Sequence, residues 1–560
     1  MTAPEEIPDR IDAPGPVGSG AVEEATVILR TLAALGVRDL VIAPGSRSAP
    51  FVYALQDEQL AGLVRAHVRI DERAAAFTAL GISRADPRHP GAVVTTSGTA
   101  TAHLHAAVLE AHHAGVPLLV LTADRPAELR DTGANQATHQ AGLYGDAVRW
   151  ASDLPAPAAG RATPAELRTA VNAVARAVAA ATGERPGPVH LNVGLRDPLT
   201  PRSAPAAAES PSIVVTRRVA PSAVPGVPIP LTGRTLVVAG DGAGPDARAF
   251  AERHRLPLLA EPSSGARSGD AMIVGYPELL GEVMASADHP LRPDRAVVFG
   301  HPTLSRPVVS GLLGADDVDV IVVDRAGTWP DASRRARRVV PAAVGEETEE
   351  AAERQQRYLA AWRASDEPAP PATWQARAAL AVWAASGPDD VLVVGSSSTV
   401  RDLERHAPAT AATIVANRGL AGIDGLISTA SGYALARRRP AGRVRALIGD
   451  LTALHDLTGL LIGPDEVEPE LDIVVLDDDG GRIFSGLEHV AAPPAVLRRF
   501  FTTPHGVDLA AAAAALGVPA RPVDADGLAD ALAEPASGRR MLVVQDLVVQ
   551  ESVSAVPETP

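Results

Sequence analysis

Two short acidic segments near the carboxyl end of the chain each follow an apolar run. Gly449-Asp450-Leu451-Thr452 comes after residues 444–448, and Asp477-Asp478-Asp479-Gly480-Gly481 comes after residues 471–476. Each run is typical of a strand that ends in a loop, and a helix is expected between them over residues 454–461. Adjacent parallel strands would bring both loops to one crevice. Carboxylates there could hold Mg²⁺ against a phosphate, and the glycines would let the backbone approach it. Two ordinary turns with acidic helix caps would give the same pattern.

A second candidate is Glu72, which lies on a short turn between an apolar stretch and an alanine-rich helix. If the turn buries this glutamate, its pKa rises and it could share a proton with a ligand nitrogen. If the turn is exposed, Glu72 would only pair with Arg69 or Arg73. The position alone leaves both interpretations open.

Arginines follow several of the expected strands, at Arg47, Arg125, Arg401 and Arg418. A guanidinium fork binds a carboxylate through two parallel hydrogen bonds, so four such residues predict a substrate with several carboxylates. Any one of them could also be an ordinary surface arginine. The candidates gather in the first and third parts of the chain, which predicts one site built between two sheets.

These side chains must be held by the elements around them. In the first part, apolar runs at residues 39–43, 92–96, 116–122 and 188–193 alternate with helical stretches. That alternation is typical of a parallel sheet with helices on both faces. It begins again near residues 235 and 373. We therefore expect an α/β protein with three doubly wound parallel-sheet domains.

Composition suggests where these domains begin and end. Residues 1–20 are acidic and rich in Pro and Gly, which predicts a disordered leader. The domains are expected over residues 21–200, 212–365 and 373–560, joined by linkers over 201–211 and 366–372. Domains of roughly 150–200 residues fit this length, because a chain of 560 residues is too long for one hydrophobic core.

The overall composition excludes several classes of function. A net charge of −16 argues against nucleic acid or an anionic membrane as the main partner. The chain has no cysteine, and its 51 basic residues are all arginine, so cysteine and lysine nucleophiles and phosphate-binding lysines are excluded. The leader has no apolar core and no stretch is long enough to span a membrane, which predicts a soluble, cytoplasmic protein.

One glycine-rich loop, Gly240-Asp241-Gly242-Ala243-Gly244, could suggest a dinucleotide site. It lacks the full G-x-G-x-x-G spacing, and no clear ribose-binding acid follows it. Nicotinamide binding is therefore a weak interpretation.

Seven motifs together resemble those of thiamine diphosphate (ThDP)-dependent enzymes. More narrowly, they resemble the family of 2-succinyl-5-enolpyruvyl-6-hydroxy-3-cyclohexene-1-carboxylate (SEPHCHC) synthases of menaquinone biosynthesis. The resemblance covers nearly the whole chain after the leader. The motifs are Pro44-Gly45-Ser46-Arg47-Ser48, Asp71-Glu72-Arg73, Thr96-Ser97-Gly98-Thr99-Ala100, Leu121-Thr122-Ala123-Asp124-Arg125-Pro126, Gly133-Ala134-Asn135-Gln136, Asn417-Arg418-Gly419 with Gly422-Ile423-Asp424-Gly425, and Gly449-Asp450-Leu451-Thr452.

The resemblance implies a domain order of pyrimidine-binding, central and diphosphate-binding domains, and a cofactor pair of ThDP with Mg²⁺ or Mn²⁺. Glu72 would bind the aminopyrimidine of ThDP and promote formation of the ylide. Asp450, Asp478 and the Gly480 carbonyl would hold the metal ion, and Ile423 would keep the cofactor bent. Other cofactor contacts are expected at Ser97, Gly98, Thr99, Gly449, Leu451 and Ile483.

For the substrates, the resemblance implies decarboxylation of 2-oxoglutarate and a Stetter-like 1,4-addition of the product to isochorismate, which gives SEPHCHC and CO₂. Arg401 and Arg418 would join Glu72 as catalytic residues. The expected substrate contacts are Ser46, Arg47, Arg125, Asn135, Gln136, Ser397, Arg401, Arg418 and Phe484.

Two further expectations come from the same resemblance. Many ThDP enzymes have asparagine where this chain has Asp478, and the extra negative charge could alter metal preference. In addition, Glu72 of one chain would act with Asp450 of another, which predicts a homodimer or homotetramer.

Two alternatives remain open from the sequence. One is another ThDP-dependent 2-oxoacid decarboxylase or carboligase. The other is a non-catalytic metabolite sensor that keeps the fold. The number of arginines and the segment 133–136 favour the synthase family over both.

Overall fold

The computed structural model describes residues 9–203, 211–218, 224–437 and 442–546. The chain forms two compact units that are not continuous in sequence. The first comprises Met1–Pro221, Gly419–Arg439 and Asp456–Pro469. The second comprises Ser222–Arg418, Pro440–His455 and Glu470–Pro560. Each unit is described separately below.

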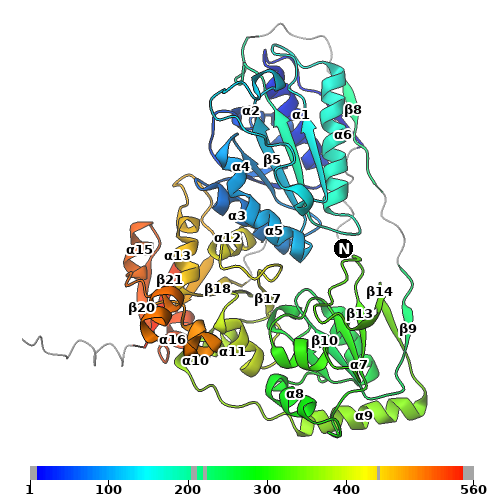
Figure 1. The fold of residues 1–560 in the computed structure, drawn as a ribbon. Coiled ribbons are helices and arrows are strands. Elements are labelled where there is room, and N and C mark those ends of the chain that lie inside the picture. The colour runs from blue at the N-terminus through cyan, green and yellow to red at the C-terminus, as the bar shows by residue number, and fades with distance from the viewer. Residues whose placement is uncertain (1–8, 204–210, 219–223, 438–441, 547–560) are drawn as a thin grey trace, which may run out of the picture. The chain divides into compact units, whose positions relative to one another are not determined.

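The first unit contains a six-stranded parallel sheet in the order β3-β2-β4-β5-β7-β6. Its strands are β2 (Asp39–Ile42), β3 (Arg65–Val68), β4 (Ala92–Thr95), β5 (Leu118–Asp124), β6 (Trp150–Leu154) and β7 (Pro188–Gly194). On one face lie α1 (Gly20–Ala34), α2 (Ala49–Ala54) and α6 (Pro164–Ala181). On the other face lie α3 (Glu72–Ala85) and α5 (His105–Ala114), the latter preceded by the short α4 (Thr99–His103) (Figure 1).

Strand β2 shows how the sequence produces these two layers. Because successive strand residues point to opposite faces, Leu40 and Ile42 pack beneath α1 and α6, whereas Val41 packs beneath α3 and α5. Both faces are apolar. The sheet is therefore buried on both sides, as a parallel sheet requires.

A helix from much later in the chain, α12 (Leu426–Ala436), packs closely on α3. Two glycines permit this approach: a Cβ atom at Gly81 would lie 2.0 Å from the carbonyl oxygen of Thr429, and one at Gly432 would lie 2.0 Å from that of Thr78. Packing therefore assigns residues 419–439 to the first unit, although the expected linear range placed them in the third domain.

The second unit contains two further large parallel sheets and one two-stranded parallel pair. The central one has the order β11-β10-β12-β13-β14, and β9 (Val227–Pro230) pairs separately with β15 (Ala343–Glu346). The central strands are β10 (Thr235–Ala239), β11 (Leu258–Ala260), β12 (Arg295–Phe299), β13 (Asp319–Val323) and β14 (Ala336–Val340). Their helices are α7 (Pro245–His254), α8 (Tyr276–Ala285) and α9 (Glu349–Ala364).

The other sheet of this unit has the order β17-β16-β18-β19-β21-β20. Its strands are β16 (Val391–Val394), β17 (Thr413–Val415), β18 (Val444–Gly449), β19 (Leu471–Leu476), β20 (Ala520–Asp524) and β21 (Arg539–Gln545). Its main helices are α10 (Trp374–Ala384), α11 (Ser398–His406), α13 (Asp450–His455), α15 (Leu509–Ala515) and α16 (Leu528–Ala533). The expectation of three doubly wound parallel sheets is therefore confirmed.

Two local expectations need correction. Residues 10–12 form β1 (Arg10–Asp12), which pairs antiparallel with β8 (Ser212–Val214), and the Ser19 side chain caps α1. The prediction of a disordered leader is thus wrong for residues 9–20, because main-chain pairing and a helix cap hold them. Residues 1–8 lie outside the described residues. The helix expected over residues 454–461 is instead α13, which begins at Asp450, followed by a 3₁₀ turn over Leu457–Leu460.

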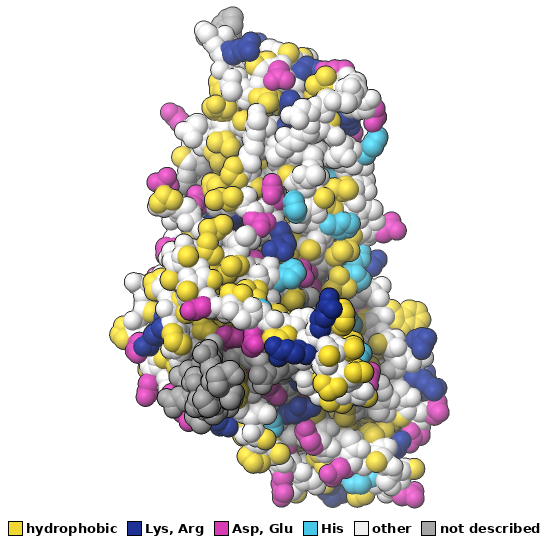
Figure 2. Space-filling view, turned by 60° about the vertical axis from the view of Figure 1, so that its left-hand side comes forward, with side chains coloured by type: hydrophobic (Ala, Val, Ile, Leu, Met, Phe, Trp, Pro, Cys, Tyr) yellow, Lys and Arg dark blue, Asp and Glu magenta, His cyan; other side chains and the backbone are white. Residues whose placement is uncertain are grey.

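The face drawn in Figure 2 intersperses charged side chains of both signs with hydrophobic ones, as is usual for a globular protein. Among the described helices, none is both long and apolar enough to cross a membrane.

Candidate active site

Several of the predicted site residues follow strands at which the winding of a sheet reverses. In the first unit this switch lies between β2 and β4, which are neighbours although β3 separates them in sequence. In the third sheet it lies between β16 and β18. Ligands of doubly wound folds bind outside the carboxyl ends of such strands. Ser46 and Arg47 follow β2, residues 97–99 follow β4, Ser397 follows β16, and Asp450 follows β18.

Hydrogen bonds bring four predicted residues of the first unit together. The Arg125 guanidinium donates to the Ser97 hydroxyl and to the Asn135 carbonyl oxygen, both at 2.5 Å. The Gln136 amide donates to the Ser97 carbonyl oxygen at 3.0 Å. Arg125 and Ser97 are buried, whereas Asn135 and Gln136 are exposed. The loop after β4 is thus held by the segment that carries the other two residues.

Gln140, which the sequence did not single out, holds the same loop from inside. It is only 1% exposed. Its side-chain oxygen accepts a hydrogen bond from the Gly98 backbone N–H at 2.9 Å. Its amide nitrogen donates to the Ala123 carbonyl oxygen at 3.2 Å and to the Asn192 side-chain oxygen at 3.0 Å. One side chain thereby joins the loop after β4 to strands β5 and β7.

Arg47 lies in the same part of the first unit. It donates to the Leu195 carbonyl oxygen at 2.8 Å, and its guanidinium lies 3.5 Å from the Asp197 carboxylate. Burial lowers the pKa of Arg125, and the positive charge of Arg47 lowers it further. Two like charges at this edge favour binding of an anion. Ser46 is exposed beside them.

Glu72 is the first residue of α3 and is half-buried. The preceding residue, Asp71, caps the helix by accepting hydrogen bonds from the N–H groups of Arg73 and Ala74. The Thr458 hydroxyl also donates to Asp71 at 2.6 Å. Burial alone would raise the pKa of Asp71, but these hydrogen bonds outweigh it and lower the pKa. The cap holds the first turn of α3 and thereby fixes the backbone position of Glu72.

The structure places three possible metal ligands together at the carboxyl ends of β18 and β19: Asp450, Asp477 and His505. Their ligand atoms all lie within 4.8 Å of one another. The His505 ring nitrogen is 3.2 Å from the Asp450 carboxylate and 3.9 Å from that of Asp477. Burial raises the pKa of Asp450, and the charge of Asp477 raises it further, against hydrogen bonds to the carboxylate. Two buried carboxylates with an imidazole form a donor set that fits a divalent cation.

The predicted partners of Asp450 are arranged differently from one another. Gly480 donates its N–H to Asp450 at 2.6 Å, with φ +129 and no room for a side chain, since a Cβ atom would lie 2.1 Å from the Thr502 carbonyl oxygen. The Asp478 carboxylate instead accepts a hydrogen bond from the Gln375 amide at 3.2 Å. The side chain grouped with Asp450 is that of Asp477.

The expected substrate residues of the second unit form a separate group. Ser397 caps α11, and Arg401 donates to the Ser397 carbonyl oxygen at 3.4 Å. Arg418 is 7% exposed and donates to the Thr303 hydroxyl at 2.6 Å. Burial lowers the pKa of Arg401, and the charge of Arg418 adds to the effect.

The remaining predicted residues lie at the edges of these groups. Thr99, exposed, begins α4. Leu451, half-buried, donates its N–H to Asp450, and Gly449 ends β18. Ile483 and Phe484 lie in the 3₁₀ turn Arg482–Gly486, where the Phe484 ring contacts those of His489 and Phe501. Ile423 is half-buried in the first unit, to which Glu72 also belongs, whereas Asp450 belongs to the second.

Comparison with known proteins bears on both the fold and the family. Residues 23–143 match the family described as thiamine pyrophosphate enzyme, N-terminal TPP binding domain. A SEPHCHC synthase of Kineococcus radiotolerans is 48% identical, with 94% of this chain and 96% of the relative covered. One of Nocardioides sp. is 44% identical, with 94% and 95% covered. The chain belongs to the SEPHCHC synthase family.

A solved structure agrees with the fold of this SEPHCHC synthase family member. Benzoylformate decarboxylase from Polynucleobacter necessarius superposes with a TM-score of 0.66 at 19% identity, covering 94% of this chain and 98% of that one. At that identity the similarity shows the fold alone. The family itself is shown by the relatives that match along the whole length.

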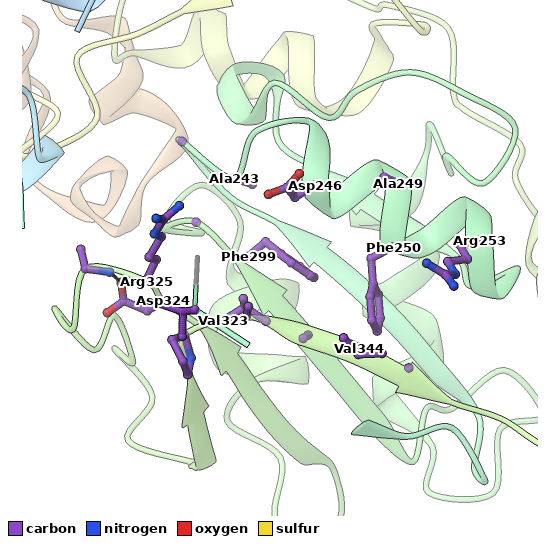
Figure 3. Close-up of a pocket in the computed structure, with 18 of the residues that line it drawn as sticks. Ala243, Asp246, Ala249, Phe250, Arg253, Phe299, Val323, Asp324, Arg325 and Val344 are labelled. Carbon is purple, nitrogen blue, oxygen red and sulfur yellow. Dashed lines mark hydrogen bonds between the residues drawn. The ribbon is translucent and has the colours of Figure 1, made fainter. Parts of the chain in front are cut away.

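The central sheet of this family member carries a hollow of about 570 Å³ beside the glycine-rich loop. Figure 3 shows Phe250 and Phe299 along its floor, with ring centroids 5.7 Å apart, and Arg253 and Arg325 toward opposite ends. The Asp324 carboxylate also lines it, but accepts hydrogen bonds from the N–H groups of Ala326 and Trp329 in its own turn. Its hydrogen bonds are therefore directed to its own loop.

Proposed function

We propose that this protein is a ThDP-dependent synthase that decarboxylates 2-oxoglutarate and adds the resulting four-carbon unit to isochorismate, giving SEPHCHC and CO₂ in menaquinone biosynthesis. The observation that carries this proposal is the 48% identity, along 94% of the chain, to a protein named as a SEPHCHC synthase. The arginines at the two predicted substrate groups support it, because both proposed substrates are carboxylates.

The proposed cofactor is ThDP with a divalent cation, Mg²⁺ or Mn²⁺. When bound, ThDP would supply a carbon nucleophile for the keto group and would take up the electron pair that remains when CO₂ leaves. We assign the cation to Asp450, Asp478 and the Gly480 carbonyl, as the family resemblance implies. The cluster of Asp450 with Asp477 and His505 supports a cation at this edge and offers a competing set of ligands.

The chain's own residues then have distinct roles. Glu72 holds and moves a proton at the aminopyrimidine ring of the cofactor. Arg401 and Arg418 bind substrate carboxylates from the second unit, with Ser397, and Phe484 borders the pocket. In the first unit, Ser46, Arg47, Arg125, Asn135 and Gln136 bind the remaining carboxylate and hydroxyl groups. Ile423 and Ile483 contact the cofactor, with the backbone around Ser97, Gly98, Thr99, Gly449 and Leu451.

We further propose that the protein is a homodimer or homotetramer in which Glu72 of one chain acts with Asp450 of another. The placement of these two residues in different compact units is compatible with such a division. Sedimentation of active enzyme at assay concentration tests it, and a strictly monomeric active species would exclude it.

The first test is an assay of purified protein with ThDP, Mg²⁺ and 2-oxoglutarate, with and without isochorismate. The expected result is CO₂ release coupled to isochorismate consumption and dependent on ThDP. A rate of CO₂ release that is the same with and without isochorismate would assign the protein to another class of 2-oxoacid enzymes. ThDP binding without any turnover would favour a metabolite sensor.

A further inference from the structure

The central sheet positions a buried acid, Glu261, that has no role in the proposed mechanism. Glu261 directly follows β11 and is 2% exposed. One carboxylate oxygen accepts hydrogen bonds from the backbone N–H groups of Thr303 at 2.7 Å and Leu304 at 2.9 Å. The other oxygen is buried and has no hydrogen-bond partner among the described residues. Such a group requires an explanation, because an unpaired buried carboxylate oxygen destabilises a fold.

The position of Glu261 in the topology excludes one explanation. In dinucleotide-binding folds, an acid about 20 residues beyond the glycine-rich loop, at the end of the neighbouring strand, binds a ribose hydroxyl. Glu261 occupies that position relative to Gly240 and β10. Glu261 is buried, and its carboxylate already accepts hydrogen bonds from Thr303 and Leu304, so it does not contact a ribose.

The loop whose backbone is bound by Glu261 also contacts Arg418, a proposed substrate-binding residue. The Thr303 hydroxyl accepts a hydrogen bond from the Arg418 guanidinium at 2.6 Å, while the Thr303 backbone N–H is bound to Glu261. The Nε atom of Arg418 is buried and has no partner among the described residues. Arg418 is thus held at one end of its guanidinium by a residue of the central sheet.

We propose that Glu261 and Thr303 are positioning residues that orient Arg418 toward a substrate carboxylate. The inference rests on the proposed function, which makes Arg418 a substrate contact. Glu261 fixes the backbone of Thr303, and the Thr303 hydroxyl fixes one nitrogen of the guanidinium. The planar guanidinium then keeps a fixed orientation, in which its other terminal nitrogen can donate to a substrate carboxylate. The central domain therefore takes part in substrate binding without touching the substrate.

Glu261 also interacts electrostatically with Arg418. The pKa of Glu261 is raised to about 8, first by burial and then by the nearby Glu404, against the opposing effects of the two N–H groups and of Arg418. Glu404 is itself held by the Tyr276 hydroxyl at 2.6 Å. Arg418 and the two N–H groups favour the ionised form of Glu261, whereas burial and Glu404 oppose it more strongly.

The test compares Thr303→Val, which removes the hydroxyl at nearly constant volume, with Thr303→Ser, which keeps it. The first variant should weaken binding of one carboxylate substrate, isochorismate or 2-oxoglutarate, with a KM about tenfold higher, as expected for loss of a hydrogen bond to a charged group. Its kcat and ThDP affinity should stay within about twofold of wild type. Thr303→Ser should restore the wild-type KM. Unchanged KM values in Thr303→Val, or an equal loss in Thr303→Ser, would overturn the proposal.

The second comparison tests the buried acid. Glu261→Gln keeps an acceptor for the Thr303 N–H but can no longer ionise, and should raise the same KM about threefold. Glu23→Gln is its matched control: Glu23 is also 2% exposed and accepts two backbone N–H groups, from Val17 and Ala162, in the first unit. That control should leave every KM unchanged. An equal KM increase in both variants would refute a specific role for Glu261.

Binding measurements separate this inference from the proposed reaction. If wild-type protein does not consume isochorismate, the proposed function fails, and the thermal shifts produced by 2-oxoglutarate and by isochorismate, each added alone, become the readout. Arg418→Ala should abolish one of these two shifts and Thr303→Val should reduce the same one. Full shifts with both ligands in either variant would overturn the positioning role whatever the reaction is.

Discussion

Replacing Gln140 by leucine tests whether the loop after β4 binds the cofactor. The side chain is 1% exposed and makes three hydrogen bonds, to the Gly98 N–H, the Ala123 carbonyl oxygen and the Asn192 side chain. Leucine has a similar size but can make none of them. The Gly98 N–H would then be buried without this acceptor, inside a turn where Gly98 has φ +83 and cannot easily rearrange.

The size of the effect follows from these contacts. A buried donor left without its acceptor costs about 1–3 kcal/mol, and each of the other two hydrogen bonds contributes about 0.5–1.5 kcal/mol. The expected loss is therefore roughly 2–6 kcal/mol in the stability of the first unit, partly offset by burial of the added methyl groups. If about 1.4 kcal/mol of this loss must be supplied to restore the binding conformation of the loop, the Kd of ThDP rises about tenfold.

The assay is a titration with ThDP at saturating Mg²⁺, together with urea unfolding of the same samples. Gln355→Leu is the matched control, because Gln355 is 0% exposed and bonds the Thr235 N–H and the Leu231 and Gly233 carbonyl oxygens. It should lose comparable stability in the central sheet and keep wild-type ThDP affinity. Wild-type affinity in Gln140→Leu, despite lost stability, would show that the loop does not bind ThDP.

Five further substitutions test other parts of the chain. Glu72→Gln should bind ThDP normally but lose turnover by at least about a hundredfold; near-normal turnover, with CO₂ release as the readout, would remove Glu72 from proton transfer. Asp450→Ala and Asp478→Ala should each weaken ThDP binding in the presence of Mg²⁺ by about tenfold or more. If Asp477→Ala weakens it and Asp478→Ala does not, the cation is bound by the set that the structure groups together. Asp456→Asn should stabilise the first unit, since burial raises the pKa of Asp456 to about 6 and the folded chain therefore favours the protonated form. The stability cost of Asp456 begins above the unfolded pKa near 4 and is complete above about pH 6, on the order of 3 kcal/mol. The urea midpoint should thus gain more at pH 7.5 than at pH 5, and an equal gain at both values would contradict this linkage.

Much of the fold could be predicted from the sequence because its strands carry a strong signal. Runs such as residues 39–43 and 471–476 are apolar throughout, and each turns polar or glycine-rich where the strand ends. The same signal located the loops after β2, β4, β16 and β18, whereas the strand order that makes them switch points is known only from the structure. Local pattern is sufficient here, because strand ends and binding loops coincide in parallel sheets.

The parts that could not be predicted depend on contacts between distant residues. Asp477 and Asp478 are adjacent and chemically identical, and only the packing of Gln375 and His505 distinguishes them. Gln140 lies in a polar loop where a glutamine normally faces water, yet it is buried by strands β5 and β7. Pattern gives no information on such pairings.

Glu261 shows why a motif and its surroundings must be considered together. The sequence offers a glycine-rich loop without a clear ribose-binding acid, whereas the topology places Glu261 where that acid would be. Because Glu261 is buried, it binds the Thr303 N–H and not a ligand hydroxyl. The Thr303 hydroxyl in turn accepts a hydrogen bond from Arg418. A sheet with the architecture of a nucleotide-binding domain can thus support a different site. The residue at the end of β11 binds the loop after β12, and that loop contacts a residue of the other site. For this chain, that is the arginine proposed to bind substrate.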